Sequence, residues 1–353
     1  MPKEAVGKAM VEKDTRSVFR ETVGAPAVKP QLCVIVDTEE EFDWNKFSSN
    51  ALSVTNIGHQ EVLQYIYDDF GIIPTYAVDY AVASQENGYR PLREFLMDKK
   101  CEIGSHLHPW INPPITEEIC AKNSYPCNLE SNLEFSKIKE LTDVITDKFE
   151  VRPILYKAGR YGVGRNTISS LEALGYLIDC SVLPGTDLRP QQGPNFSDFS
   201  GDPYWIASTS LMEIPVTTGF PGVLGSRKAT VYPWLHSRWG ERARLPSIFA
   251  RTRLLDRIRL TPEGISLREA KRLTRHLTAD RHFQLLTLTY HSSSLGVGNT
   301  PYVRDQTDLS KFIAWIKDYL EFFFGEIGGT ATTARLIYQQ AAFLRHERSS
   351  DVD

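Results

Sequence analysis

The stretch QLCVIVDTEE, residues 31–40, is an unbroken apolar run that ends in acidic residues. A short apolar run bounded by polar residues is typical of a strand buried on both faces, as in a parallel sheet. Further runs of this kind are IIPTYAVDY (72–80), CEIGSHLHPW (101–110), RPILYKAGRYG (152–162), YLIDCSV (176–182), LMEIPVT (211–217) and FQLLTLTYHSS (283–293). Their repetition predicts that a parallel sheet forms the centre of the protein.

Segments with helical spacing lie between and after these runs. In residues 132–149, an apolar stripe is formed by Phe135, Ile138, Leu141, Val144 and Ile145. Similar segments cover residues 59–70, 90–100, 166–175, 309–324 and 331–344. Strands that alternate with helices predict an α/β protein, either a barrel or a doubly wound sheet.

The composition excludes several classes of protein. The chain has 353 residues, of which 41% are hydrophobic and 24% charged, as in folded domains. Its net charge of −4 argues against a protein that binds nucleic acid through a basic surface. No apolar run approaches the roughly 20 residues that span a bilayer, and the first residues lack the apolar core of a signal peptide. The five cysteines, an odd count without a CxxC pair, predict free thiols and a cytoplasmic location.

Polarity, periodicity and charge divide the chain into a few segments. Residues 1–29 are polar and aperiodic, so we expect a leader without regular structure. We expect one barrel over residues 30–345 and a tail over residues 346–353. Residues 238–281 hold twelve Lys or Arg but five Asp or Glu, which predicts an inserted segment of amphipathic helices with a basic face. The alternative for this segment is a surface that meets an anionic substrate or makes a peripheral contact with an anionic membrane.

Polar side chains gather where the predicted strands end. They are Asp37, Glu39, Glu40, Asp79, His106, His108, Lys157, Arg160, Asp179 and His291. Because the carboxyl ends of parallel strands meet at one edge, we expect these residues to form a site. His106 and His108 are two residues apart, so their imidazoles point the same way in an extended chain. Two histidines with one carboxylate make a hydrolytic zinc site; the alternative is a His pair that lines a polar loop.

Other residues have two interpretations each. Asp37 and Glu39 share a face by the same spacing, which suits one for the metal and the other for a base. Asp79 either lines the site or caps the following helix. Trp110 adjoins the histidines, where its ring can stack on a sugar, although Trp is more often a core residue. Ser292 begins a loop that either faces the substrate or only connects two elements.

Five ordered motifs carry a resemblance to a known family. VIVDTEEEFDW, EIGSHLHPW, LYKAGRYGVG, LIDCSVLP and LLTLTYHSSSL resemble the motifs of the polysaccharide deacetylases, the carbohydrate esterase family 4 with the NodB homology domain. HLHPW, AGRYG and HSSSL resemble a subgroup linked to cell-surface polysaccharide loci. The resemblance implies a distorted (β/α)7 barrel, a divalent metal that is usually zinc, and a substrate that is an acylated sugar or oligosaccharide.

The resemblance also implies roles for individual residues. Asp37 would be the general base, and the metal would be held by Glu39, His106 and His108. His291 would be the general acid, oriented by Asp179. Lys157 or Arg160 would keep Asp37 ionised, and a backbone N–H near Tyr161 would bind the oxyanion.

The chain departs from the family pattern at several of these positions. Thr38 stands where the family has a second Asp, which leaves Glu40 as a rival of Glu39 for the metal. One residue separates the two histidines where the family has three, and Lys157 replaces the usual Arg. A deacetylase that acts on a sugar or sugar precursor is the function that these motifs favour. The alternatives are a non-catalytic barrel that binds saccharide or partner proteins, and a deformylase that acts on a lipid-linked amino sugar.

Overall fold

A sheet of parallel strands lies at the centre of the computed structural model, which describes residues 19–22, 29–44, 46–222, 224, 231, 242, 245, 255–279 and 285–350. The parallel strands follow the order β8 (Met212–Glu213), β6 (Ile178–Asp179), β5 (Leu155–Ala158), β4 (Glu102–Leu107), β3 (Thr75–Val78), β2 (Gln31–Thr38) and β11 (Leu285–His291). Each of them lies within one of the predicted apolar runs.

The sheet curls into a barrel that is not closed by a direct pairing of its outer parallel strands. The gap between β8 and β11 is bridged by a small antiparallel pair, β9 (Thr218–Gly219) with β10 (Ile258–Arg259). Beside this pair, Leu260 N donates to Thr217 O at 2.9 Å, and Thr289 N of β11 donates to Leu260 O at 3.3 Å. The predicted distorted (β/α)7 barrel is therefore confirmed.

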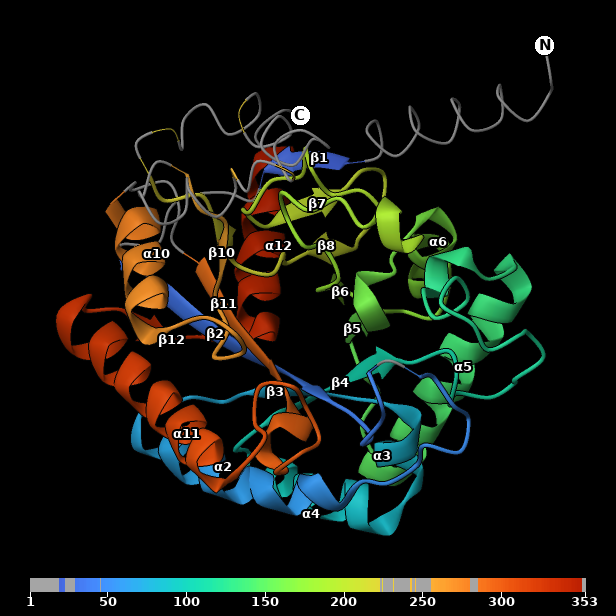
Figure 1. Ribbon diagram of the computed structural model, residues 1–353. Coiled ribbons are helices and arrows are strands. Elements are labelled where there is room, and N and C mark those ends of the chain that lie inside the picture. Colours follow the sequence, from blue (N-terminus) through green and yellow to red (C-terminus); the bar gives the residue numbers. More distant parts are fainter. Residues whose placement is uncertain are drawn as a thin grey trace.

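Helices surround the strands, as Figure 1 shows. They are α2 (Gln60–Asp69), α3 (Tyr80–Ser84), α4 (Glu86–Met97), α5 (Ser131–Phe149), α6 (Arg165–Ala173), α10 (Leu267–Ala279), α11 (Gln306–Glu321) and α12 (Ala334–Ser350). In α5, the predicted stripe is packed inward, with Ile138, Leu141 and Ile145 fully buried. The helix begins where the Glu130 carboxylate accepts hydrogen bonds from the backbone N–H groups of Asn132 and Leu133.

The two faces of β2 enter different parts of the core. Val34 and Val36 pack in the large cluster shared with the surrounding helices, whereas Cys33 and Ile35 pack in a second cluster with Leu155. The first half of α12 packs against this second cluster through Ile337 and Ala341. Successive strand residues alternate in direction, so Asp37 follows Cys33 and Ile35 on the same face.

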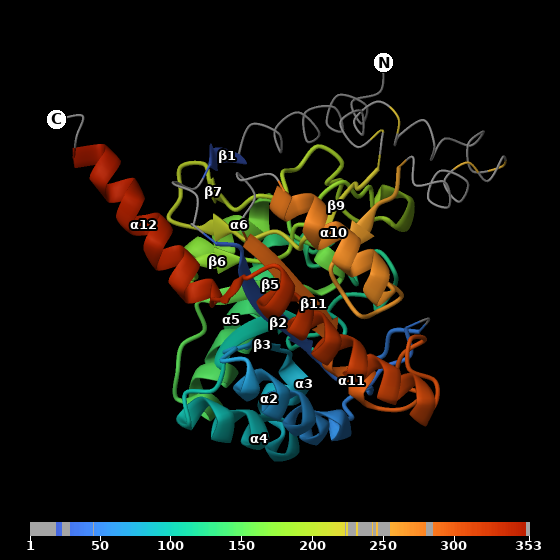
Figure 2. The ribbon, with the colours of Figure 1, turned by 90° about the vertical axis from the view of Figure 1, so that its left-hand side faces the viewer.

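Two predicted boundaries differ from the structure. Within the leader, Phe19–Thr22 forms strand β1, which pairs antiparallel with β7 (Tyr204–Ile206) at the edge of the sheet. An edge strand leaves unpaired N–H and C=O groups, and these attract a further strand. At the other end, α12 continues to Ser350, into the predicted tail, and Figure 2 shows this helix extending outward from the barrel.

The predicted basic insertion lies partly outside the described residues. Of residues 238–281, the structure describes 242, 245 and 255–279, which include β10 and α10. Its predicted peripheral contact with a membrane therefore stays a prediction. Among the described helices, none combines the length and the apolar composition needed to cross a bilayer.

Candidate metal and acid–base site

Most of the predicted site residues lie together at the carboxyl ends of the parallel strands. In register, His291 of β11 lies beside Asp37 of β2, and His106 of β4 lies beside Lys157 of β5. A cavity of about 270 Å³ opens there, and its lining includes Asp37, Glu39, His106, His108, Trp110, Arg160, Tyr161, Arg259 and His291. Six of the polar residues expected at this edge thus line one cavity: Asp37, Glu39, His106, His108, Arg160 and His291.

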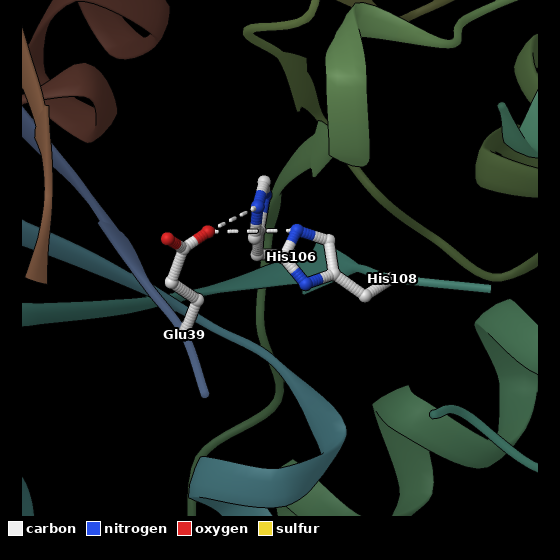
Figure 3. Close-up of side chains that lie close together, drawn as sticks. All are labelled: Glu39, His106 and His108. Atoms are coloured by element: carbon white, nitrogen blue, oxygen red, sulfur yellow. Dashed lines mark ion pairs between the residues drawn. The ribbon is translucent and has the colours of Figure 1, made fainter. Parts of the chain in front are cut away.

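Glu39, His106 and His108 converge on one point, as Figure 3 shows. Oε2 of Glu39 lies 3.5 Å from Nε2 of His108 and 3.8 Å from Nε2 of His106. All three side chains are buried. Two imidazole nitrogens and one carboxylate oxygen form a donor set that suits zinc and leaves a position for water or substrate.

Hydrogen bonds to Nδ1 orient both histidines. Nδ1 of His106 lies 3.1 Å from the backbone carbonyl oxygen of Lys157, and Nδ1 of His108 lies 2.8 Å from Oε2 of Glu40. Because these oxygens accept, each Nδ1 donates and each Nε2 keeps its lone pair free toward Glu39. Burial lowers the pKa of His106 and lowers that of His108 to about 4, which keeps both rings neutral as metal ligands must be.

The structure distinguishes the two adjacent glutamates. Both carboxylate oxygens of Glu40 are engaged, Oε2 with His108 and Oε1 with the indole N–H of Trp110 at 2.8 Å. Glu39 accepts a hydrogen bond from Ser293 at Oε1 and directs Oε2 to the histidines. Glu39 therefore faces the two histidines, and Glu40 holds His108 in place.

Asp37 lines the same cavity and has a partner at each oxygen. Oδ1 accepts a hydrogen bond from the Lys157 ammonium, and Oδ2 lies 3.6 Å from Nε2 of His291. Burial alone would raise the pKa of Asp37, but Lys157, His106 and His291 together lower it to about 2. Lys157 is therefore the partner of Asp37. Arg160, the other predicted partner, instead donates to Ser124 Oγ at 2.5 Å.

His291 is oriented by Glu263, which is not among the site residues predicted from the sequence. Nδ1 of His291 lies 2.8 Å from Oε2 of Glu263, whose Oε1 accepts from the His291 backbone N–H and from Ser294 Oγ. Burial lowers the pKa of His291, but Glu263 and Glu39 outweigh it and raise the pKa to about 10. Glu263 lies in the basic segment 238–281, and no strand end or motif marks it there.

The predicted pairing of Asp179 with His291 is wrong. Asp179 accepts from Ser181 Oγ at 2.5 Å and lies in register beside Glu213 of β8. Its neighbours Ile178 and Cys180 pack in the same cluster as Cys33 and Ile35. Since strand residues alternate, Asp179 points to the other face of the sheet and cannot follow Asp37 into the cavity.

Asp79 and Ser292, two of the residues predicted to contact the substrate, hold other parts of the site in place. Asp79 caps α3 by accepting from Val82 N at 2.7 Å, and it also accepts from Glu40 N; it does not line the cavity. Ser292 Oγ accepts from Glu39 N at 3.0 Å and so holds the backbone of Glu39 in place. Of the two interpretations of Asp79, the helix cap is therefore the correct one.

Aromatic side chains form much of the cavity wall. Trp110 lines the cavity and stacks on His108 with 4.2 Å between ring centroids. Trp44 meets His291 edge-on at 5.0 Å, and Phe42 meets His108 edge-on at 5.4 Å. Tyr161 lines the cavity from a left-handed backbone conformation, φ 61°. Flat apolar surfaces beside polar groups are suited to the faces of sugar rings.

Comparisons with known proteins agree with this architecture. No family model matches the chain, and no curated protein matches its sequence significantly. A solved structure from Mycobacterium smegmatis, provisionally named a polysaccharide deacetylase, is similar with a TM-score of 0.54 and 14% identity over 93% of this chain and 96% of that chain. The allantoinase Puue is similar with a TM-score of 0.50 and 15% identity over 91% of this chain and 96% of that chain.

The chain thus has the fold of the polysaccharide deacetylases, as the motif resemblance implied. The allantoinase has a similar fold, and its name assigns it a different substrate. At this level of identity the likeness concerns the fold alone, so the activity has to be derived from the site.

Proposed function

We propose that this chain is a metal-dependent hydrolase that removes an acyl group, acetyl in the first place, from an amino sugar or sugar precursor of a cell-surface polysaccharide. One observation carries the proposal: a single cavity joins the buried group Glu39, His106 and His108 to an ionised Asp37 and a protonated His291. Amide hydrolysis requires both a base for water and an acid for the leaving amine.

Glu39, His106 and His108 are the residues that would hold a divalent metal, and zinc fits their oxygen and nitrogen donors best. The neutral histidines, fixed at Nδ1, support this assignment. When bound there, such a metal supplies polarisation of the acyl carbonyl and a lowered pKa of water.

The protein's own residues divide the proton transfers between them. Asp37, held ionised by Lys157, accepts the proton of the attacking water. His291 donates a proton to the departing nitrogen, because an amine leaves far more readily than an amide anion. Glu263 compensates the charge of His291, and a backbone N–H near Tyr161 is our candidate donor to the oxyanion.

A non-catalytic barrel that binds saccharide or partner proteins is the alternative. The complete pairs Asp37–Lys157 and His291–Glu263 favour the enzyme, since a binding protein gains nothing from an acid and a base that face each other. All five cysteines are free, which supports a reducing compartment and a precursor substrate within it.

Two variants test the proposal. His106→Ala should lose bound metal and amine release together, whereas Asp37→Asn should keep the metal and lose at least about a hundredfold in amine release. Metal content by mass spectrometry and amine release from N-acetylated sugars measure the two effects. Purified protein that carries no metal, with activity unchanged in His106→Ala, would refute the proposal.

A further inference from the structure

The cavity carries two cations that the proposed reaction does not use. Arg160 and Arg259 both line it. Lys157 and His291 have carboxylate partners there, Asp37 and Glu263 respectively. Among the described residues, neither arginine forms an ion pair; each instead donates to neutral oxygens. A guanidinium that lines a cavity without a carboxylate partner is available to a ligand.

The hydrogen bonds of the two arginines show how they are held. Nη1 of Arg259 donates to the hydroxyl of Tyr161 at 2.7 Å. Nη1 of Arg160 donates to Ser124 Oγ, and its guanidinium lies over the rings of Tyr125 and Phe47 at 4.2 and 5.2 Å. Both guanidinium groups are positioned by neutral contacts that leave further N–H donors free.

The backbone at Arg160 and at the next residue, Tyr161, is strained. Arg160 and Tyr161 are consecutive non-glycine residues with φ of 54° and 61°. A left-handed conformation costs on the order of 1 kcal/mol or more for such residues, so the surrounding contacts must hold it in place. This turn directs Arg160 toward Tyr125 and Phe47 while Tyr161 reaches Arg259. The fold therefore maintains a costly conformation that keeps both cations at the cavity.

The charge of the cavity is positive even before a metal is counted. With the ion pairs counted whole, Asp37, Glu39 and Glu263 contribute three negative charges, and Lys157, His291, Arg160 and Arg259 contribute four positive ones. A divalent metal would add two more positive charges. A neutral acylated sugar offers no counter-charge to this surface, whereas a phosphate or carboxylate does, and an arginine fork binds either of them through paired hydrogen bonds.

We propose that the substrate is an anionic acylated amino sugar, whose phosphate or carboxylate is bound by Arg160 and Arg259. The proposal rests on the proposed function and narrows its substrate class. The acyl group then lies at Asp37 and His291, which line the same cavity. Arg259 belongs to the basic segment 238–281, so that segment contributes at least one positive charge directly to the cavity.

Binding measured by calorimetry tests this inference without relying on turnover. The probes are N-acetylglucosamine, its 1-phosphate, and N-acetylglucosaminuronic acid, each titrated into chelator-treated protein and into zinc-loaded protein. We expect the anionic probes to bind at least about tenfold more tightly than the neutral one in both forms. The anionic probe with the higher affinity identifies phosphate or carboxylate as the natural group. Equal affinities for all three probes would overturn the inference.

Variants show whether the arginines or the metal cause the preference for anionic probes. Arg259→Gln and Arg160→Gln should each reduce the preference about tenfold, and Arg259→Lys and Arg160→Lys should restore part of it. Arg275 lies on α10 and forms an exposed ion pair with Glu326. Arg275→Gln removes this positive charge away from the cavity and should leave the preference for anionic probes unchanged. Thermal unfolding of each variant establishes that it is folded. A preference that survives in folded Arg259→Gln and Arg160→Gln would contradict the assignment.

Amine release from the same probes distinguishes the two proposals. If the neutral sugar is hydrolysed as fast as the anionic ones, the substrate class is wrong while the hydrolase stands. If the arginines produce an anionic preference in binding and no probe releases amine, the binding inference stands while the proposed hydrolase fails.

Discussion

At the scale of single residues, Asp37 and His291 are neighbours that carry opposite charges. Asp37 and His291 approach to 3.6 Å, yet the pKa of Asp37 is lowered to about 2 and that of His291 is raised to about 10. Burial opposes both charges, and each is retained because a buried partner of opposite charge, Lys157 or Glu263, contacts it. A base and an acid are thus available together over a wide range of pH.

The role of Glu263 can be tested through the pH dependence of the reaction. The pKa of His291 is raised in the folded protein, so its charged form stabilises the fold below about pH 6.5, and this contribution is lost as the pH rises through about 10. Activity that needs protonated His291 should decline over the same upper range. In Glu263→Gln the attraction to the carboxylate is gone, and the decline should begin at lower pH.

The measurement is kcat/KM as a function of pH for wild type and Glu263→Gln, with denaturant unfolding at each pH. Glu213→Gln is a matched control, because that buried glutamate pairs with Asp179 instead of His291. An unchanged alkaline limb in Glu263→Gln would contradict the role we assign to Glu263.

At the scale of elements, the turn after β5 is fitted closely against the end of β4. A Cβ at Gly159 would lie 2.5 Å from the backbone oxygen of Leu107 and 2.6 Å from Cδ2 of His108. No side chain has room there, since one neighbour is backbone and the other is the ring of His108. The glycine is therefore required by the contact between two elements that together shape the site.

Gly159→Ala should consequently damage both the fold and the metal site. We expect a loss of about 1–3 kcal/mol in the free energy of unfolding, because overpacking displaces backbone or side chains. We also expect weaker metal binding, since the clash moves His108. Denaturant unfolding and a metal competition titration measure the two effects.

Gly58→Ala is the control for this substitution, because nothing lies within 4 Å of its added Cβ. It should change the stability by less than about 1 kcal/mol and leave the metal affinity unaltered. Metal affinity equal to wild type in a destabilised Gly159→Ala would show that the turn does not position His108.

At the scale of the whole molecule, the site unites segments that are far apart in the chain. Glu39 and the two histidines come from the ends of β2 and β4, Lys157 comes from β5, His291 from β11, and Glu263 follows β10. Only the folded barrel brings these side chains together. A metal at Glu39, His106 and His108 should therefore bind the native state in preference to the unfolded chain.

Metal removal should lower the thermal stability accordingly. At a free metal concentration a hundred times Kd, native-state binding stabilises by about 2.7 kcal/mol, so a chelator should lower Tm by several degrees. Differential scanning calorimetry with and without chelator measures the shift. His106→Ala, which lacks one ligand, should show a much smaller shift; an equal shift in this variant would place the metal elsewhere.

The sequence by itself determined the strands of the parallel sheet, most helices and the edge at which the polar residues gather. Buried parallel strands need unbroken apolar runs, so QLCVIVDT could be assigned to a strand from local pattern alone. The spacing of His106 and His108 likewise predicted that both rings share one face. These features depend on residues close together in the chain, and the chain order of the strands placed their ends at one edge.

Only the tertiary structure decided which polar neighbours enter the cavity. Glu39 faces the histidines while Glu40 holds His108, and Glu263 takes the place expected for Asp179. The face on which a strand residue lies, and the position of a residue in a distant loop, depend on packing between segments that the sequence pattern does not relate. The protonation states follow from the same packing, because burial and partner charge act only once the chain is folded.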